Sequence, residues 1–550
     1  MKFQSYLVPS VLAALAALAP GAYAVPETIA SVPAYSLYII GAGEEDALLE
    51  QQIARIAKLD DTDATKSSLT EYITSDGNHR LYIFRSSSAS NAPSALPATL
   101  TDPNLGALAN VPDGSVVAIH KYSAGGAIES TAPVANRTAQ PKWIKANQTA
   151  PAGTAANVTV LTTVGATSNI TFSKVTFSAA LSAANVESRR PDIGLVTAEP
   201  ASFLGRTAGP VKNPDTSTFP GFTVLKKDIA ALTGIVPTAD LVNAIVVTKA
   251  LRDALQRAQG LVVGSELEAD VPSLTSAQIN GLFTQAIVDW SNFRTGSTST
   301  ALTAVPAQNP PAQTKVFVVR RDNGSGNQIG TEGFFTQGAF NWAPATVADT
   351  DTGLTTVPTG PHVFSGSNTR ANQDTLKTYN TGNIWAIGLL STEKPNLNTT
   401  TQASARENGY RFVAVNGATP SLVNVVKGRY PIYNTTAVVY NTNYLKTRPA
   451  GTQYLTAAIT RGLNNPGLLG PVNENLQINL ASGVSANYWG GGFLVSTPGT
   501  DAVNGSAYVP STTAPTAETV LSSPINPNSK QISGAIRNNG PSVLIYPSLQ

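Results

Sequence analysis

The chain has 550 residues, of which only 13% are charged, and its formal net charge is +2. This balance excludes the basic footprint of a nucleic-acid-binding domain and leaves no acidic tail. The absence of cysteine excludes disulfides, thiol nucleophiles and cysteine-based metal sites. The three histidines, His79, His120 and His362, lack the spacing of a zinc site. We therefore expect neither a metal nor a cofactor.

The first 24 residues have the order of a cleavable secretory signal. Met1 and Lys2 precede an apolar run over residues 11–19, and the segment ends in Ala22-Tyr23-Ala24. The apolar run is too short to span a bilayer, which takes about 20 residues, and no later stretch is apolar enough to do so. We predict export to the periplasm or medium of a Gram-negative bacterium, without membrane insertion, and a mature chain that starts near Val25.

Along the mature chain, short β-branched and aromatic runs alternate with segments of helical periodicity. After a predicted strand at residues 36–40 comes the turn Gly41-Ala42-Gly43, and residues 44–59 then carry apolar residues at helical spacing. Further strands are predicted at residues 82–84, 115–119, 193–196, 241–248, 315–319, 384–390 and 411–415, and a helix at 249–260. This alternation favours an α/β fold with a mainly parallel sheet flanked by helices.

Two segments interrupt this pattern. Residues 136–169 are rich in Ala, Thr and Asn, which predicts an insertion or an irregular surface excursion. Beyond about Gly490 the chain is rich in Ser, Pro, Asn and Gly, so we expect part of it to be poorly packed.

The most informative stretch is residues 316–327, which read Val-Phe-Val-Val-Arg-Arg-Asp-Asn-Gly-Ser-Gly-Asn. A buried strand here delivers Arg321 and then the glycine-flanked Ser325 to a helix start, where free backbone N–H groups and the helix dipole favour an anion. An arginine supplies a charged clamp and a serine a hydroxyl donor. An ordinary polar turn with a surface arginine pair fits the same spacing. The stretch lacks the Gly-Lys-Ser/Thr of a Walker loop, and the chain has no complete Gly-x-Ser-x-Gly elbow.

This strand-Arg-x-x-Gly-Ser-Gly turn resembles the second phosphate loop of the periplasmic phosphate-binding proteins of ABC importers. Other blocks follow in the order of that family: Val271-Pro272-Ser273-Leu274-Thr275 with Ile279, Leu282-Phe283 and Asp289-Trp290; residues 384–388; and Pro420 through Gly428-Arg429-Tyr430-Pro431-Ile432. Upstream, Gly41-Ala42-Gly43, Ser123-Ala124-Gly125-Gly126 and residues 192–197 resemble its remaining ligand loops. The resemblance runs from about Ile39 to Tyr440 and leaves the C-terminal hundred residues uncovered.

The resemblance implies a two-lobed type II periplasmic binding fold with a ligand cleft between the lobes. Its domains would be a signal at 1–24, lobe 1 at 25–244 with a polar insertion near 136–170, lobe 2 at 245–432, and a return to lobe 1 at 433–550 with a C-terminal extension. It also implies a ligand site made of Gly43, Glu45, Ser123, Gly125, Thr197, Arg321, Ser325, Gly326 and Asn327.

The chain departs from the family pattern at several of these positions. Glu45 stands where the family has a hydroxyl residue, and a carboxylate repels a bound anion unless it is protonated. Acidic residues are also well placed in the first turn of a helix, and we favour that role for at least two of Glu44, Glu45 and Asp46. Thr197 replaces the Asp that accepts the proton of hydrogen phosphate, and Asn323 and Asn327 replace an Asp and a Thr.

The sequence supports two hypotheses about function. In the first, the protein binds phosphate or a related small oxyanion and serves an ABC importer or acts as a sensor. In the second, it is a secreted structural or interaction protein on the same fold that has lost high-affinity binding. An enzyme is not expected, because no nucleophile, metal cluster or acid/base pair stands out.

Overall fold

The computed structural model describes residues 26–60, 63, 65–87, 96–136, 140–161, 169–295, 300–346, 353–394, 409–426, 429–475 and 492–495. The predicted signal, Gly428 and the chain beyond residue 495 lie outside these ranges. Within them, no helix combines the length and the apolar character needed to cross a membrane.

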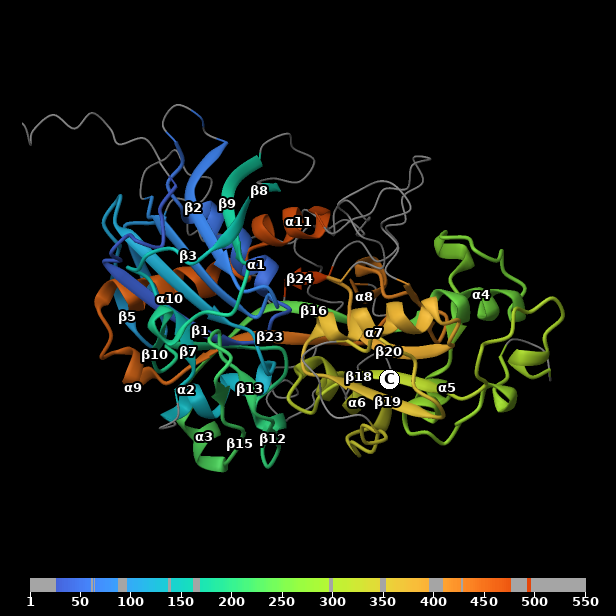
Figure 1. Ribbon diagram of the computed structural model, residues 1–550. Helices are drawn as coiled ribbons and strands as arrows, with labels where there is room; N and C mark the ends of the chain where they lie inside the picture. The colour runs from blue at the N-terminus through green and yellow to red at the C-terminus, as the bar shows by residue number, and fades with distance from the viewer. Residues whose placement is uncertain are drawn as a thin grey trace, which may run out of the picture.

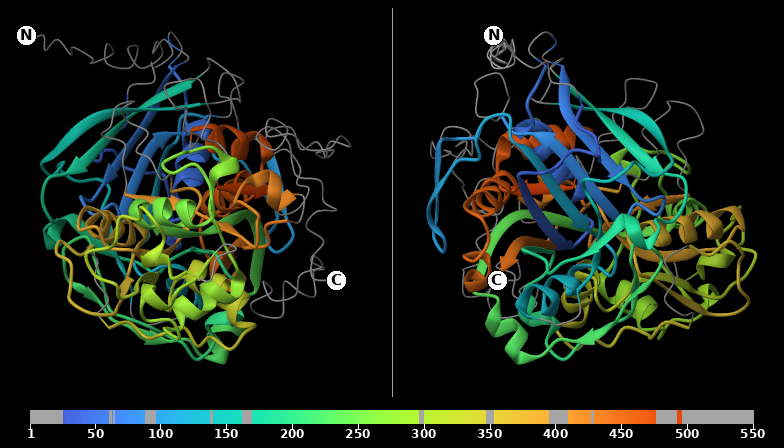
Figure 2. Two further views of the ribbon diagram at one scale, coloured as in Figure 1. Left: turned by 90° about the vertical axis from the view of Figure 1, so that its right-hand side faces the viewer. Right: turned by 60° about the vertical axis from the view of Figure 1, so that its left-hand side comes forward.

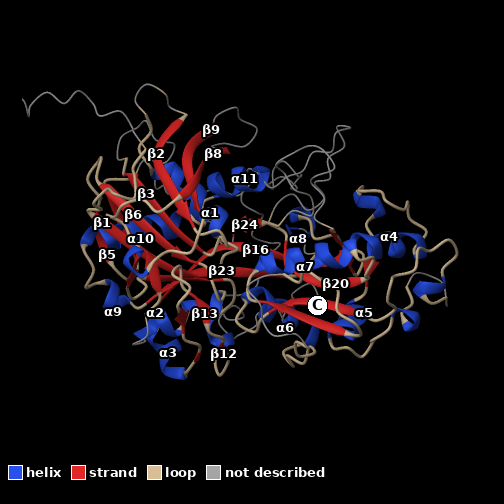
Figure 3. Cartoon of the chain, viewed as in Figure 1, coloured by secondary structure: helices blue, strands red, loops and turns tan. Residues whose placement is uncertain are grey.

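The molecule is built on one large mixed sheet with helices on its faces (Figures 1 and 3). Its fourteen strands are β1 (Tyr35–Gly41), β2 (Lys66–Ile73), β3 (His79–Arg85), β6 (Val116–Tyr122), β8 (Gly153–Leu161), β9 (Asn169–Phe177), β11 (Ile193–Val196), β16 (Gly234–Thr248), β18 (Phe317–Arg321), β19 (His362–Gly366), β20 (Ala386–Ser391), β21 (Tyr410–Phe412), β23 (Tyr433–Tyr440) and β24 (Phe493–Val495). Their order along the main path is β19-β18-β20-β16-β23-β11-β1-β6-β3-β2-β9-β8, and β21 and β24 also pair with β16.

The helices and the small ribbons lie around this sheet. The helices are α1 (Asp46–Ile56), α2 (Ala132–Asn136), α3 (Lys226–Ala231), α4 (Lys249–Ala258), α5 (Ser276–Phe283), α6 (Gly326–Thr336), α7 (Thr369–Thr381), α8 (Leu422–Val426), α9 (Thr442–Leu445), α10 (Ala450–Gly462) and α11 (Pro466–Asn475). Paired ribbons are formed by β4 (Thr99–Asp102) with β5 (Gly106–Ala109), β7 (Lys142–Ile144) with β10 (Val186–Ser188), β12 (Thr207–Ala208) with β15 (Phe222–Thr223), β13 (Val211–Lys212) with β14 (Thr218–Phe219), and β17 (Ser273–Leu274) with β22 (Ala414–Val415).

Two central strands divide the sheet into halves. We call the strands from β11 to β8, with the helices and loops beside them, the first half, and β18, β19, β20 and β21, with theirs, the second half. The 15-residue strand β16 pairs antiparallel with β23 and also with β20 and β21, so one strand belongs to both halves. In the first half β1 is parallel to both β6 and β11, and in the second half β18 is parallel to both β19 and β20.

Each half has its own core. Side chains of a strand alternate between the two faces of the sheet, so apolar residues pack against helices on both faces. In β18, Val318 packs with α4 and α5, whereas Phe317 and Val319 pack with α7 on the opposite face. In the first half, Ile39 of β1 and Ile119 of β6 pack with residues of α1 and α10 in one large cluster. The predicted α/β class is therefore confirmed, with antiparallel pairs at the central strands and beyond β6.

The expected irregular excursion at residues 136–169 is wrong for the part that the structure describes. Strand β8 lies in this segment and pairs antiparallel with β9 along nine residues, and the resulting hairpin forms the outer edge of the sheet (Figure 2). Apolar residues alternate with threonine in part of each strand, as in Val158-Thr159-Val160 of β8 and Ile170-Thr171-Phe172 of β9, and such β-branched and aromatic residues suit a half-exposed strand. The composition of the segment concealed this pattern.

Candidate functional site

The first loop of the candidate site follows β1 and is shaped by Gly41. This glycine has a φ of 110°, and a side chain on it would collide with Ser130 and with the carbonyl of Leu195. Only glycine permits both the conformation and the close approach. The next residue, Ala42, donates its backbone N–H to Leu195 O at 2.9 Å, which fixes the loop against β11. Gly43, Glu44, Glu45 and Asp46 then follow, and α1 begins at Asp46.

A buried lysine holds this loop against the end of β6. The Lys121 ammonium donates to Gly41 O at 2.9 Å and to Ser123 Oγ at 2.8 Å, and the Ser123 hydroxyl donates to the Asp46 carboxylate at 3.0 Å. Burial lowers the pKa of Lys121, and the nearby Asp46 carboxylate opposes that effect. The predicted donor Ser123 is thus already engaged by residues of the chain.

Arg321 ends β18 and faces the first half of the molecule. Its guanidinium is 3.2 Å from Glu44 Oε1, and both side chains are almost completely buried. It also donates to Thr369 Oγ1 at 2.8 Å, Ser367 O at 2.8 Å and Gly366 O at 3.1 Å. Arg321 is therefore already paired with an oxyanion, namely the carboxylate of Glu44 in the same chain.

Its neighbour Arg320 points to the other side of the strand, as alternation requires. There it donates to the Arg321 carbonyl at 2.9 Å and to Asn323 Oδ1 at 3.4 Å.

The start of α6 packs directly on the first half and the central strands. Ser325 is the N-cap residue, and its hydroxyl accepts from the Gln328 N–H at 3.4 Å. A side chain on Gly326 would collide with Thr197 at the end of β11, whose own hydroxyl is buried without a hydrogen-bond partner. Asn327 donates to Glu44 Oε1 at 3.2 Å, so Glu44 binds both α6 and Arg321.

Glu45 turns away from Arg321. Its side chain is fully buried, and Thr238 donates to its Oε1 at 3.0 Å. Burial raises the pKa of Glu45 to about 7, partly offset by the hydroxyls of Thr436 and Thr238. The expected first-turn role for at least two of the three acids differs from what we find, because only Asp46 lies within α1 and all three have long-range partners.

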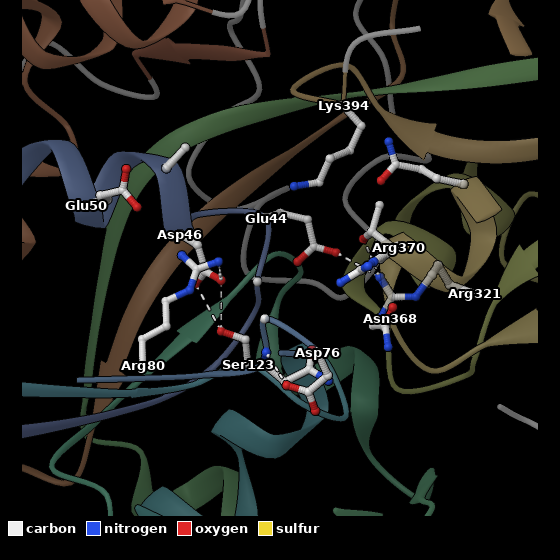
Figure 4. Close-up of a pocket in the computed structure, with 16 residues that line it drawn as sticks. Glu44, Asp46, Glu50, Asp76, Arg80, Ser123, Arg321, Asn368, Arg370 and Lys394 are labelled. Carbon is white, nitrogen blue, oxygen red and sulfur yellow. Dashed lines mark hydrogen bonds and ion pairs between the residues drawn. The ribbon is translucent and has the colours of Figure 1, made fainter. Parts of the chain in front are cut away.

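A cavity of about 350 Å³ lies between the two halves beside the Glu44–Arg321 pair (Figure 4). Its lining consists of Gly43, Glu44, Asp46, Ala47, Glu50, Asp76, Gly77, Asn78, Arg80, Ser123, Arg321, Asn368, Thr369, Arg370, Gln373 and Lys394. A second cavity of about 440 Å³ opens beside Gly125, Arg320 and Gly324. Between them the halves are in direct contact, since the Ile128 N–H donates to Gly324 O at 2.9 Å.

The structure brings the predicted loops together at this contact. Gly43, Ser123 and Arg321 line the first cavity, and Gly125 lines the second. Thr197, Ser325, Gly326 and Asn327 lie in the packed region between them, and Glu45 is buried behind the first loop. No cluster of three or more acidic or histidine side chains in the described part of the chain is placed to hold a metal ion.

Sequence reasoning did not identify several charged residues that shape the cavity. Arg80 lies 3.3 Å from Asp46, and Arg370 donates to Ser75 O at 3.2 Å across the boundary between the halves. Lys394 extends from the second half toward Glu44 (Figure 4). One signal was present: Lys121 follows the apolar run at residues 116–119 and His120 in the same strand, and a buried cation of this kind needs a partner.

No family model matches the sequence, and no curated protein matches it. Solved structures resemble the chain in part. A Clostridium perfringens protein solved with bound phosphate is 16% identical over 46% of this chain and 72% of its own, with a TM-score of 0.28. An ABC-type phosphate transport receptor from Vibrio cholerae is 15% identical over 48% and 73%, with a TM-score of 0.25. PstS from Borrelia burgdorferi is 12% identical over 52% and 78%, with a TM-score of 0.24. Values this low assign neither a family nor a ligand.

Proposed function

We propose that the protein is an exported, non-enzymatic solute-binding protein of the two-lobed type II architecture that takes a small oxyanion such as phosphate between its lobes. Lobe 1 would comprise residues 25–244 and 433–550 and would contain the first half, and lobe 2 would comprise residues 245–432 and would contain the second half. Separate cores on either side of β16 and β23 support this division. An ABC importer in the membrane is the corresponding partner, and the periplasm is the corresponding location.

The observation that carries the proposal is the carboxylate clamp at Arg321. A strand end from one half presents a buried guanidinium to the glycine loop of the other half, and the group it holds is the carboxylate of Glu44. Carboxylate and phosphate are recognised by arginine through the same charge-assisted hydrogen bonds. The site is thus chemically suited to an oxyanion, with Glu44 as an internal competitor.

This competition has a definite cost. Removing one partner of a buried ion pair costs roughly 3 to 5 kcal/mol because the other charge stays buried and unpaired. A free anion that displaces Glu44 from Arg321 pays a cost of this kind. We therefore expect weak binding of inorganic phosphate to the natural protein.

The test is calorimetric titration of phosphate and sulfate into wild-type protein and the Glu44→Gln variant. Glutamine keeps the shape of the side chain and removes its charge, so the variant should bind phosphate at least about tenfold more tightly, equivalent to ~1.4 kcal/mol. Arg321→Ala in the Glu44→Gln background should abolish the gain. Arg320→Ala, on the opposite side of the strand, should preserve it. If Glu44→Gln binds neither anion, the oxyanion proposal is wrong.

A structural or interaction role is the second candidate, and one observation favours it. The polar groups expected to face a ligand have partners within the chain, as with Ser123 on Asp46 and Ser325 on Gln328. The halves are also joined by a direct backbone hydrogen bond from Ile128 to Gly324. Failure of every titration above would leave this candidate as the better account.

A further inference from the structure

The two walls of the cavity beside Arg321 carry opposite charge. The wall from the first half contributes four carboxylates, Glu44, Asp46, Glu50 and Asp76, and one guanidinium, Arg80. The wall from the second half contributes three cations, Arg321, Arg370 and Lys394, and no carboxylate that lines the cavity. Two of these cations have carboxylate partners of their own, since Lys394 lies 3.4 Å from the buried Glu393 and Arg370 lies 3.7 Å from Asp374. An inorganic oxyanion placed between these walls meets attraction on one side and repulsion on the other.

The charges are placed across the cavity from one another (Figure 4). Asp46 and Glu50 project from α1 on one side, and Arg370 and Lys394 come from the other, with the ammonium end of Lys394 pointing into the space beside Glu44. The cavity of about 350 Å³ is within the usual range of small-molecule sites, roughly 300 to 1,000 Å³, and has room for a solute of several heavy atoms.

The Glu44–Arg321 pair determines which solute fits best. An oxyanion that takes Arg321 leaves the buried Glu44 without its ion-pair partner, which is unfavourable. A solute that carries an ammonium as well as an oxyanion re-pairs both residues, because its ammonium binds Glu44 while its anionic group binds Arg321. No buried charge is then left unpaired, and the opposite walls of the cavity favour the same orientation.

We propose that the natural solute is a small zwitterion, with a primary ammonium and a phosphonate, phosphate or carboxylate group a few bonds apart. This inference rests on the proposed function, since it takes the cavity between the halves as the solute site. In the bound complex, the ammonium faces Glu44 and Asp46, and the anionic group faces Arg321 and Lys394.

Matched pairs of probes that differ only in the amine test this proposal. Wild-type protein and Glu44→Gln are titrated with 2-aminoethylphosphonate against ethylphosphonate, and with β-alanine against propionate. In at least one pair, wild-type protein should bind the amine-bearing probe about tenfold or more tightly than its partner, a difference expected for one buried charge-assisted contact. Glu44→Gln should lose that preference while binding the amine-free anion more tightly. The pair that shows the preference identifies the anionic group.

The possible outcomes separate this inference from the proposed function. If wild-type protein binds both members of each pair equally, the zwitterion is wrong and the oxyanion site stands. The same holds if only Glu44→Gln binds, and binds both members equally. If neither protein binds any probe or phosphate, both proposals fail, and the opposite charges serve only to hold the halves together.

Discussion

At the scale of single residues, the site is dominated by carboxylates that the protein keeps away from solvent. Glu44 is neutralised by Arg321 and Asp46 by Lys121 and Arg80. Glu45 is the exception, because threonine hydroxyls rather than a cation face its carboxyl group and burial raises its pKa. The same loop therefore holds two paired charges and one group that favours its neutral form.

The pKa of Glu45 predicts a specific dependence of stability on pH. Between the usual pKa of a glutamate, about 4.3, and about 7, the folded protein retains a proton that the unfolded chain has released, so the free energy of unfolding falls as pH rises. The loss is nearly complete above pH 7 and amounts to roughly 3 to 4 kcal/mol for this group. Glu45→Gln stays neutral and should escape it.

Urea unfolding of both proteins from pH 4.5 to 8 measures this effect. The stability of Glu45→Gln relative to wild type should be lowest at pH 4.5 and should increase toward pH 7. Comparison at each pH removes the contributions of other titrating groups, such as Asp192, whose pKa burial raises to about 6. A difference that is constant with pH would contradict the assignment.

The identity of the site loops was accessible from the sequence, whereas their pairing was not. Arg321 and Ser325 stand in a local strand-turn-helix pattern, which can be read within a dozen residues. The partner of Arg321 lies 277 positions away in the sequence, and no local pattern encodes a contact of that separation. The sequence accordingly predicted Glu45 near the ligand and a first-turn role for at least two of Glu44, Glu45 and Asp46, whereas the contact with Arg321 belongs to Glu44.

At the scale of elements, α6 is held by two glycines that admit neighbouring chain segments. Gly326 approaches Thr197, and Gly330 approaches Asn434 of β23, whose side chain donates to Gly326 O at 3.0 Å. A side chain at Gly330 would collide with that asparagine and displace it from its hydrogen bond. The position of α6, and of Arg321 before it, thus depends on having no side chain at Gly326 and Gly330.

We expect Gly330→Ala to destabilise the protein by about 1 to 3 kcal/mol, as overpacking usually does, although alanine favours a helix by about 1 kcal/mol. Gly281→Ala in α5 is the matched control. Its methyl group would meet only the flexible end of Ile287, 3.0 Å away, so that variant should be neutral or slightly stabilised. Chemical denaturation measures the stability of both variants. Equal stabilities would show that Asn434 moves aside without a loss of free energy of unfolding.

The elements that the sequence predicted are those with continuous apolar runs. Strands β1, β11, β18 and β20 are buried along nearly their whole length and were found close to their true bounds. Strands β2, β8 and β9 were missed because they mix Thr, Ser, Asn and Lys with apolar residues, a composition that also predicts loops. The first seven residues of β16 were missed because Pro237 and Asp240 interrupt the apolar pattern, and the pairing with β23 shifts register there.

At the scale of the whole molecule, the halves are held together by contacts that include the Glu44–Arg321 pair. Ile128 to Gly324 and Arg370 to Ser75 are further contacts across the same boundary. The halves are therefore closed against each other by direct contacts of the chain itself.

Small-angle scattering tests whether the ion pair contributes to this closure. Arg321→Met leaves Glu44 unpaired at the boundary, so the radius of gyration should increase relative to wild type. Arg411→Met is the control, because Arg411 is equally buried but pairs with Glu266 inside the second half, at 2.9 Å. The control should keep the wild-type radius, and an equal radius for all three proteins would mean that the other contacts suffice to hold the halves together.

Strand β23 lies between β11 and β16 in the sheet but is synthesised after both of them, so the sheet stays incomplete until late in synthesis. Roughly 240 residues separate Val196 from Tyr433, which at about 5 to 20 residues per second takes the ribosome on the order of 10 to 50 seconds. During that time the edge of β11 that β23 will cover has no partner, and such an edge can pair with another nascent chain. All strands of the second half leave the ribosome before β23, which the first half needs to cover β11. The newly made chain should therefore depend on chaperones most strongly in the interval before β23 leaves the ribosome.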